Sequence, residues 1–447
     1  MTFLNYANPY GMTFGLNPGS GNIANPFAFW NLLIPDLSRI GIKKVRFQLS
    51  WDSLEVPQNT FNWGALDDAI SHFNAENIQV TFPIRSAPAW GLGAPGGSQQ
   101  ASDEPWILAD PTAFANFCTV VATRYDGTHG HGTIDRYEIT NEEADIHNTD
   151  PLGGFHCTHA STSPYWGAGA GVAITNANKY KPARDPQYFV PILLAAYPAI
   201  KAVSPTVPVG MGAMWWNQPK GGGLYAQSTS QMAQFLSFMY SNGCKGNFDY
   251  INFHYYSNAT DPTVGSNQTA KFADLLTELK AVRDANNDTV HCKVTEFGWQ
   301  VPQDVPDGAT QWKYYNDILE ASRLSNFVDE VDLFTIGYNP NFGTGSSLTS
   351  LDAGVESFRQ PTFANVQAYI AQYPIWAINP PPSPVTTASQ SGAGDPGSGP
   401  SGGAGIYGLD PKIFGLAPGP RHRFWQGVGN LIQSGMNAVE DLLNYPL

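Results

Sequence analysis

Eight short segments that are apolar or alternate between apolar and polar residues recur between residues 11 and 338 of this chain. Such segments are typical of strands, while apolar residues at a three-to-four-residue spacing are typical of helices. We predict strands at residues 11–16, 44–49, 78–84, 134–140, 207–214, 250–255, 292–297 and 331–338. Helical patterns cover residues 63–74, 111–124, 186–203, 230–241, 269–286 and 308–325. This alternation predicts a parallel sheet covered by helices.

The number of strand–helix units decides between two kinds of parallel sheet. Eight units with loops of uneven length favour closure into a barrel, and an open doubly wound sheet is the alternative. The glycine-rich loop that binds phosphate in many open sheets does not follow the first predicted strand. The sequence therefore predicts an α/β fold, a (β/α)8 TIM barrel, over residues 1–378.

The composition changes sharply after residue 378. Residues 379–404 consist largely of Pro, Gly, Ser, Thr and Ala, with Asp395 as the only charged residue, so we predict a linker. In the segment 405–447, apolar side chains from Phe424 to Leu443 recur at helical spacing. We expect an amphipathic helical segment that docks on a protein partner. The alternative is that this segment folds back onto its own barrel.

The charge and hydropathy of the chain exclude two classes of partner. Its formal net charge is −14 and no basic patch is evident, so nucleic-acid binding is not expected. No apolar run reaches the length that spans a bilayer, so membrane insertion is not expected. Residues 1–10 lack the pattern of a signal peptide, and we expect a cytoplasmic location or release in a particle such as a virion.

The residue types suit a neutral polar ligand and give no metal pattern. Charged residues make up 13% of the chain and aromatic residues another 13%, and aromatic rings stack well on the C–H faces of sugars. No metal and no cofactor is expected, because the histidines around residues 129–159 lack a metal-ligand spacing. The four cysteines, Cys118, Cys157, Cys244 and Cys292, are expected to be free buried thiols, and a Cys244–Cys292 disulfide is the alternative.

Two of the predicted strands end in a glutamate. Residues 136–142 read Arg-Tyr-Glu-Ile-Thr-Asn-Glu and end in Asn141 and Glu142, while residues 293–299 read Lys-Val-Thr-Glu-Phe-Gly-Trp and contain Glu296. These are the fourth and seventh strands, which face each other across a closed barrel, and active sites of such barrels lie at the carboxyl ends of the strands. The two carboxylates are therefore expected in one cleft. The alternative for each is a place in a buried ion-pair network.

These motifs resemble those of clan-A glycoside hydrolases over roughly residues 10–375. In that clan an Asn-Glu pair ends strand four and a nucleophilic Glu ends strand seven. Arg46 is similar to the strand-two Arg that supports the nucleophile, and residues 252–256, Asn-Phe-His-Tyr-Tyr, resemble the strand-six motif whose Tyr bonds to it. Residues 82–90, Phe-Pro-Ile-Arg-Ser-Ala-Pro-Ala-Trp, resemble the clan's strand-three loop.

The resemblance implies a retaining mechanism, with Glu142 as general acid/base and Glu296 as nucleophile about 5–5.5 Å apart. It implies a substrate-binding and supporting set that comprises Arg46, Asn141, His254, Tyr256, Trp90, Trp299 and Tyr338. For His254 a supporting role next to other side chains is the alternative to a sugar contact. The sequence departs from the clan at Glu143, where a proline is usual, and at Tyr338, where many members have a tryptophan.

The main hypothesis is therefore a retaining O-glycosidase that acts on a polysaccharide or glycoconjugate without a cofactor. The alternative hypothesis is a glycan-binding or structural component of a larger assembly, such as a phage tail, with or without hydrolase activity. The combination of Glu142, Glu296 and Arg46 favours the enzyme, because a binding protein has no need for a charged pair at strands four and seven.

Overall fold

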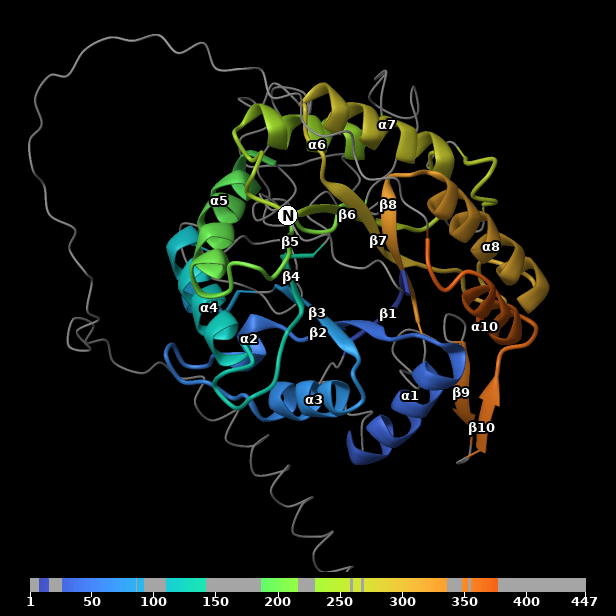
Figure 1. Cartoon of the computed structure of the whole chain (residues 1–447), viewed down its shortest axis with the longest axis horizontal. Coiled ribbons are helices and arrows are strands. Elements are labelled where there is room, and N and C mark those ends of the chain that lie inside the picture. Colours follow the sequence, from blue (N-terminus) through green and yellow to red (C-terminus); the bar gives the residue numbers. More distant parts are fainter. Residues whose placement is uncertain are drawn as a thin grey trace, which may run out of the picture. The chain divides into compact units, whose positions relative to one another are not determined.

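The computed structural model describes residues 8–15, 26–85, 87–91, 110–141, 186–215, 230–257, 260–266, 269–335, 348–352 and 355–376. Within these ranges, eight parallel strands close into a barrel in the order of the sequence, β1 to β8. Figure 1 shows the helices as a ring around the outside of this barrel. The predicted (β/α)8 fold is confirmed. The predicted linker at 379–404 and the predicted docking segment at 405–447 lie outside the described residues.

All eight predicted strands have a counterpart in the structure. The barrel strands are β1 Tyr10–Gly15, β2 Lys44–Gln48, β3 Gln79–Ile84, β4 Arg136–Ile139, β5 Val209–Gly210, β6 Tyr250–Tyr255, β7 His291–Phe297 and β8 Val328–Leu333. The helices with predicted counterparts are α3 Gly64–Ala75, α4 Pro111–Arg124, α5 Pro186–Val203, α6 Gln231–Ser241, α7 Phe272–Ala285 and α8 Gly308–Leu324. Elements without a predicted counterpart are α1 Pro26–Ile40, α2 Trp51–Leu54, the 3-10 helix η2 Ala89–Gly91, α10 Thr362–Gln372 and the hairpin of β9 Thr349–Asp352 and β10 Val355–Phe358.

The position of the eighth strand differs from the prediction. The apolar run at 331–338 predicted a strand there, whereas β8 begins at Val328 and ends at Leu333. The sequence of β8, Val-Asp-Glu-Val-Asp-Leu, holds three acidic residues, and acidic residues are uncommon in strands. Inside the barrel, however, Asp329 and Glu330 contact basic side chains of other strands, so tertiary ion pairs outweigh the local preference.

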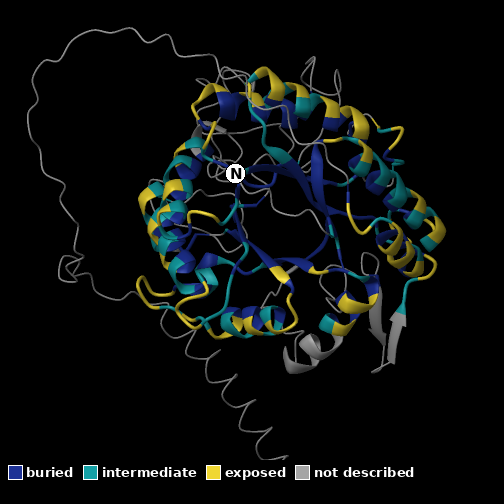
Figure 2. Ribbon diagram, in the orientation of Figure 1, coloured by how far each residue is buried: buried dark blue, intermediate teal, exposed yellow. Residues whose placement is uncertain are grey.

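The barrel wall separates an apolar outer layer from a polar interior. In β2, Val45 and Phe47 are buried hydrophobic residues of the core, whereas Lys44 and Arg46 take the alternate positions and contact acidic side chains of other strands. The ring helices bury one side and expose the other, as Figure 2 shows. Helix α4 begins where Asp110 accepts hydrogen bonds from the backbone N–H groups of Thr112 and Ala113, which is a typical N-cap.

The segment after α10 closes the barrel at the amino end of β1. The Tyr10 hydroxyl donates to the Tyr373 carbonyl at 2.7 Å and accepts from the Trp376 indole at 3.0 Å. The Asn8 backbone N–H donates to the Pro374 carbonyl at 2.7 Å. These contacts connect the first strand to residues 373–376, directly before the predicted linker at 379–404.

Cys118, Cys244 and Cys292 are buried free thiols, as predicted, and Cys157 lies outside the described residues. Across the described ranges, no helix has the length and apolar character needed to cross a bilayer.

A buried ionic cluster fills the barrel interior on the amino side. Glu330 of β8 is 1% exposed, and its Oε2 accepts from Lys44 Nζ of β2 and from Arg136 Nη1 of β4, both at 2.8 Å. Lys293 Nζ of β7 lies 3.6 Å from the same oxygen and bonds to Asp329 at 2.8 Å. Burial tends to raise the pKa of Glu330, but the charges of Arg136, Lys293 and Lys44 hold it well below its usual range.

We predict that E330Q destabilises the barrel by about 3–5 kcal/mol, because it leaves three buried cations without their shared carboxylate. The measurement is the free energy of unfolding from urea denaturation at pH 7. As the control, D317N removes a carboxylate from the exposed Lys313–Asp317 pair of α8 and should cost less than about 1 kcal/mol. Equal stabilities for E330Q and D317N would contradict the structural importance of the cluster.

Candidate active site

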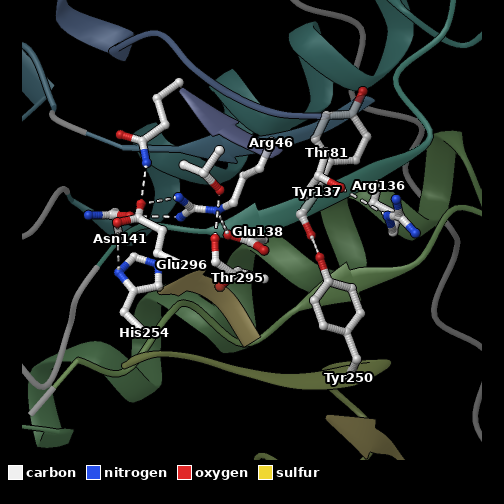
Figure 3. Close-up of polar contacts among 12 residues, drawn as sticks. Arg46, Thr81, Arg136, Tyr137, Glu138, Asn141, Tyr250, His254, Thr295 and Glu296 are labelled. Atoms are coloured by element: carbon white, nitrogen blue, oxygen red, sulfur yellow. Dashed lines mark hydrogen bonds and ion pairs between the residues drawn. The ribbon is translucent and has the colours of Figure 1, made fainter. Parts of the chain in front are cut away.

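Arg46 of β2 connects three polar side chains at the carboxyl end of the barrel. Its Nε donates to Glu138 Oε2, its Nη1 to Glu296 Oε1 and its Nη2 to Asn141 Oδ1, each at 2.7 Å. Figure 3 shows the guanidinium between these partners, which come from β4, from the residue pair that follows β4, and from β7. Arg46 is completely buried. Burial alone would lower its pKa, but Glu138 and Glu296 raise it above its usual range, so Arg46 stays charged.

Glu296 lies near the end of β7, and side chains of three other residues donate hydrogen bonds to its carboxyl group. Its Oε1 accepts from Arg46 Nη1 at 2.7 Å and from Gln48 Nε2 at 2.8 Å, and its Oε2 accepts from the Tyr256 hydroxyl at 2.8 Å. Hydrogen bonds from several donors fix the orientation of this carboxyl group. The side chain is 5% exposed, while Gln48 and Tyr256 are half-buried, so the group lies at the edge of the packed interior.

His254 of β6 lies against the same carboxylate from inside the barrel. Its Nδ1 is 3.5 Å from Glu296 Oε2, and the ring is completely buried. Burial lowers the pKa of His254 to about 3, because the Glu296 charge compensates only part of the desolvation and Arg46 acts in the same direction as burial. His254 is therefore neutral at physiological pH. A buried ring next to Glu296 fits a supporting role rather than the direct sugar contact considered from the sequence.

Two further buried carboxyl groups lie close to Arg46. Burial raises the pKa of Glu138 above its usual range although the Arg46 charge opposes this. Burial also raises the pKa of Asp332 of β8 well above its usual range, and Glu330 acts in the same direction. The Asp332 carboxyl group occupies the space beside Gly11, where a Cβ atom would lie 1.8 Å from its Oδ1, so β1 needs a glycine at this position.

The backbone turns sharply between β4 and Asn141. Thr140 has φ of 66°, a conformation that β-branched residues rarely adopt. Strained residues of this kind persist where the surroundings fix them and are common at functional sites. Here the Thr140 N–H donates to the Ile84 carbonyl at 2.9 Å, and Arg46 holds the Asn141 side chain. Glu142, the predicted acid/base, follows directly in the sequence and lies outside the described residues.

The predicted aromatic residues differ in how far they are buried, and one of them lies outside the described residues. Trp90 of η2 is half-buried with its ring edge-on to Trp51, which leaves part of it open to solvent. Trp299 is 1% exposed, and its indole N–H donates to the Ser257 hydroxyl at 2.8 Å, so it belongs to the core and we remove it from the predicted sugar-contacting set. Tyr338 lies outside the described residues.

The described histidines of the 129–159 group are His129 and His131, and each lies next to an aspartate. His129 bonds to Asp126, and His131 lies 3.7 Å from an oxygen of Asp67 in the turn that precedes β4. Among the residues that the structure describes, no group of three or more His, Cys, Asp or Glu side chains could hold a metal ion.

Gln48 and Glu138 belong to this arrangement but were not singled out in the sequence. The signal for both was the alternation of polar residues within buried strands: β2 reads Lys-Val-Arg-Phe-Gln and β4 reads Arg-Tyr-Glu-Ile. Once Arg46 is assigned to the barrel interior, the two-residue period of a strand assigns Gln48 to the same side. For β4 the same period pairs Arg136 with Glu138.

No protein-family model and no curated protein matches this sequence. Several solved structures share its fold. One is a family 39 glycoside hydrolase from Bacteroides cellulosilyticus WH2, with a TM-score of 0.56 and 15% identity; the match covers 83% of this chain and 65% of the other, just under two thirds of that enzyme. A beta-glycosidase gives 0.56 and 15%, over 85% and 99% of the two chains. A beta-glucosidase from Pyrococcus furiosus gives 0.55 and 14%, over 82% and 95%. At these identities the likeness shows that the fold is shared.

We predict that H254Q changes how stability depends on pH. Between pH about 6.5 and about 3 the unfolded chain protonates His254 while the folded protein does not, so this residue makes the wild type less stable as the pH falls through that window. The contribution is at most about 1.4 kcal/mol per pH unit, and H254Q should lack it. The measurement is the free energy of unfolding in urea from pH 7 to pH 4.

The matched control is H72Q, on the outer helix α3, which should keep the wild-type slope. An H254Q protein whose stability falls with pH as steeply as that of the wild type would show that His254 is not held neutral in the folded state.

Proposed function

We propose that this chain is a retaining glycoside hydrolase in which Glu296 is the nucleophile and Glu142 the general acid/base. The observation that carries the proposal is the environment of Glu296, whose carboxyl group lies at the carboxyl end of β7 and is oriented by Arg46, Gln48 and Tyr256. Catalytic groups of such barrels lie at this end. The similarity in fold to glycoside hydrolases is consistent with the proposal.

In the first step, a Glu296 oxygen attacks the anomeric carbon while Glu142 gives its proton to the oxygen of the leaving group. The glycosidic bond breaks, and an ester bond forms between the sugar and Glu296. In the second step, Glu142 takes a proton from water, the water oxygen attacks the anomeric carbon, and the ester bond to Glu296 breaks. The carboxylate and the acid are regenerated, and the sugar leaves with its original anomeric configuration.

The supporting residues have distinct parts in this mechanism. Arg46, Gln48 and Tyr256 fix the attacking oxygen in position, so that little motion is needed at the moment of reaction. The Arg46 bond to Asn141 Oδ1 leaves the Asn141 Nδ2 group as a donor, which would serve the sugar 2-hydroxyl. Trp90 is the described aromatic ring that we propose as a platform for the substrate.

The substrate class that we propose is a polysaccharide or glycoconjugate. Because structures with this fold include beta-glucosidases, aryl β-glucosides are the first compounds to test. The docking role of residues 405–447 and the place of the chain in a larger assembly such as a phage tail stay predictions, since these residues lie outside the described ranges.

We predict that E296Q abolishes turnover of an aryl glycoside, with kcat lower by about 10⁴-fold or more, because an amide cannot form the ester intermediate. E142A should lower kcat by about 10²–10⁴-fold, and sodium azide should restore part of this activity, because a small anion attacks the intermediate without a general base. The measurement is release of the chromophore with and without azide.

The control is E76Q, a glutamate in the exposed turn between α3 and β3, which should keep wild-type kcat. Wild-type turnover in E296Q would contradict the assignment of the nucleophile, and an E142A activity that azide leaves unchanged would contradict that of the acid/base.

A further inference from the structure

Arg85 follows β3 directly, at the carboxyl end of the barrel. The hydrogen-bond pattern of a parallel strand continues through it: the Ile84 carbonyl accepts from Thr140 N–H at 2.9 Å, and the Arg85 carbonyl accepts from Trp51 N–H at 2.8 Å. Within β3 the Thr81 side chain faces the interior, because its hydroxyl accepts from Arg136 Nε. Side chains on one face of a strand recur every second residue, which places those of residues 81, 83 and 85 on the interior side.

The neighbours of Arg85 belong to the Glu296 arrangement. On one side, β2 pairs with β3 in a register of Arg46 with Thr81, and β2 ends at Gln48, which donates to Glu296. On the other side, β4 pairs with β3 in a register of Ile139 with Ile84 and leads to Asn141. Arg85 is two residues beyond the level of Gln48, or about 7 Å further toward the open end of the barrel. By this register Arg85 lies beyond Gln48 at the carboxyl end of the barrel, which is the end where a sugar bound at Glu296 would lie.

Arg85 differs from most arginines of the described ranges in that no ion pair with a described carboxylate is formed. Six arginines of the described ranges contact a carboxylate, and these are Arg39, Arg46, Arg124, Arg136, Arg283 and Arg323. Arg85 makes no such contact with a described residue. Its Nε is buried without a hydrogen-bond partner in the structure, although the side chain as a whole is only half-buried. A buried N–H group without an acceptor is costly, unless a ligand supplies the missing acceptor.

We propose that Arg85 is a specificity-determining residue that binds an anionic substituent, a carboxylate or a sulfate ester, on the sugar next to Glu296. This inference rests on the proposed function and narrows its substrate class to acidic glycans. The guanidinium is planar and matches the geometry of such oxyanions with two parallel hydrogen bonds. A hydroxyl group would accept a hydrogen bond but would leave the positive charge of Arg85 uncompensated.

The acidic composition of the chain does not oppose such a ligand at short range. The low share of charged residues led us to expect a neutral ligand, and the net charge of −14 repels an anion at a distance. Charges separated by more than about 10 Å are, however, largely screened at 0.1 M salt. A substituent in contact with Arg85 lies well within that distance. The Glu296 carboxylate is already paired with Arg46, so it is not an isolated negative charge facing the substrate.

The test compares kcat/KM for matched pairs of substrates. One pair is 4-nitrophenyl β-D-glucuronide and β-D-glucoside, and the other is 4-nitrophenyl β-D-galactoside with and without a 6-sulfate ester. The wild type should prefer the anionic member of one pair by about tenfold or more. A preference for the glucuronide indicates a carboxylate ligand, and a preference for the sulfated galactoside indicates a sulfate ester. R85M should lower this preference by about 100-fold, and R85K by less, because lysine is a point charge without the planar fork.

The control is K245Q, which removes one positive charge from the turn between α6 and β6 and should keep the wild-type preference. A wild type that prefers the neutral members, or an R85M variant that lowers kcat/KM equally for both members of a pair, would overturn the role of Arg85.

A binding measurement separates this inference from the proposed reaction. Calorimetry records the binding of 4-nitrophenyl β-D-glucuronide, its glucoside and the 6-sulfated galactoside to E296Q and to the double variant E296Q/R85M. If the wild type hydrolyses no compound but an anionic one binds in an Arg85-dependent way, the hydrolase proposal fails and the anion site stands. If E296Q binds no anionic compound more tightly than the neutral one, the anion site is overturned, whatever the outcome for hydrolysis.

Discussion

The three hydrogen bonds of Arg46 are the interaction on which the rest of the site depends. One buried guanidinium of β2 fixes Glu138 in β4, Asn141 after β4 and Glu296 in β7. Moving a charge of this kind out of water is costly, and removal of one partner leaves the others uncompensated. The cost is offset here because each of the three guanidinium nitrogens donates to an acceptor at 2.7 Å. The position of Glu296 is therefore a consequence of barrel closure, since strands from three parts of the sequence must meet at Arg46.

The polar interior has two levels, and their charges are balanced differently. Toward the amino side, Glu330 is shared by Lys44 and Arg136 with Lys293 nearby. Toward the carboxyl side, burial raises the pKa values of Glu138 and Asp332, which favours their protonated forms. A chain in which every second residue of a strand must meet such partners has little freedom to shift its register.

The sequence allowed the barrel and the centre of the site to be predicted because both depend on short local patterns. Strand–helix alternation indicated the barrel, and strand-end motifs indicated Arg46, Asn141, Tyr256 and Glu296. What could not be predicted depends on tertiary contacts. Strand β8 was placed three residues too late because its acidic residues are stabilised by cations of distant strands, and Trp299 is in the core because Ser257 accepts its indole N–H. Gln48 became recognisable only once the interior face of β2 was known.

We propose that the carboxylate held by Arg46, Gln48 and Tyr256 forms a covalent bond to the sugar. The most direct measurement is mass spectrometry after incubation with the 2-deoxy-2-fluoro analogue of a glycoside that the wild type hydrolyses, because the fluorine slows the second step and allows the glycosyl-enzyme to accumulate. We expect the mass of the chain to increase by one sugar, and peptide fragmentation should locate this sugar on Glu296. Labelling of a different residue, or an inverted anomer as the first product in proton NMR together with an unlabelled chain, would contradict it.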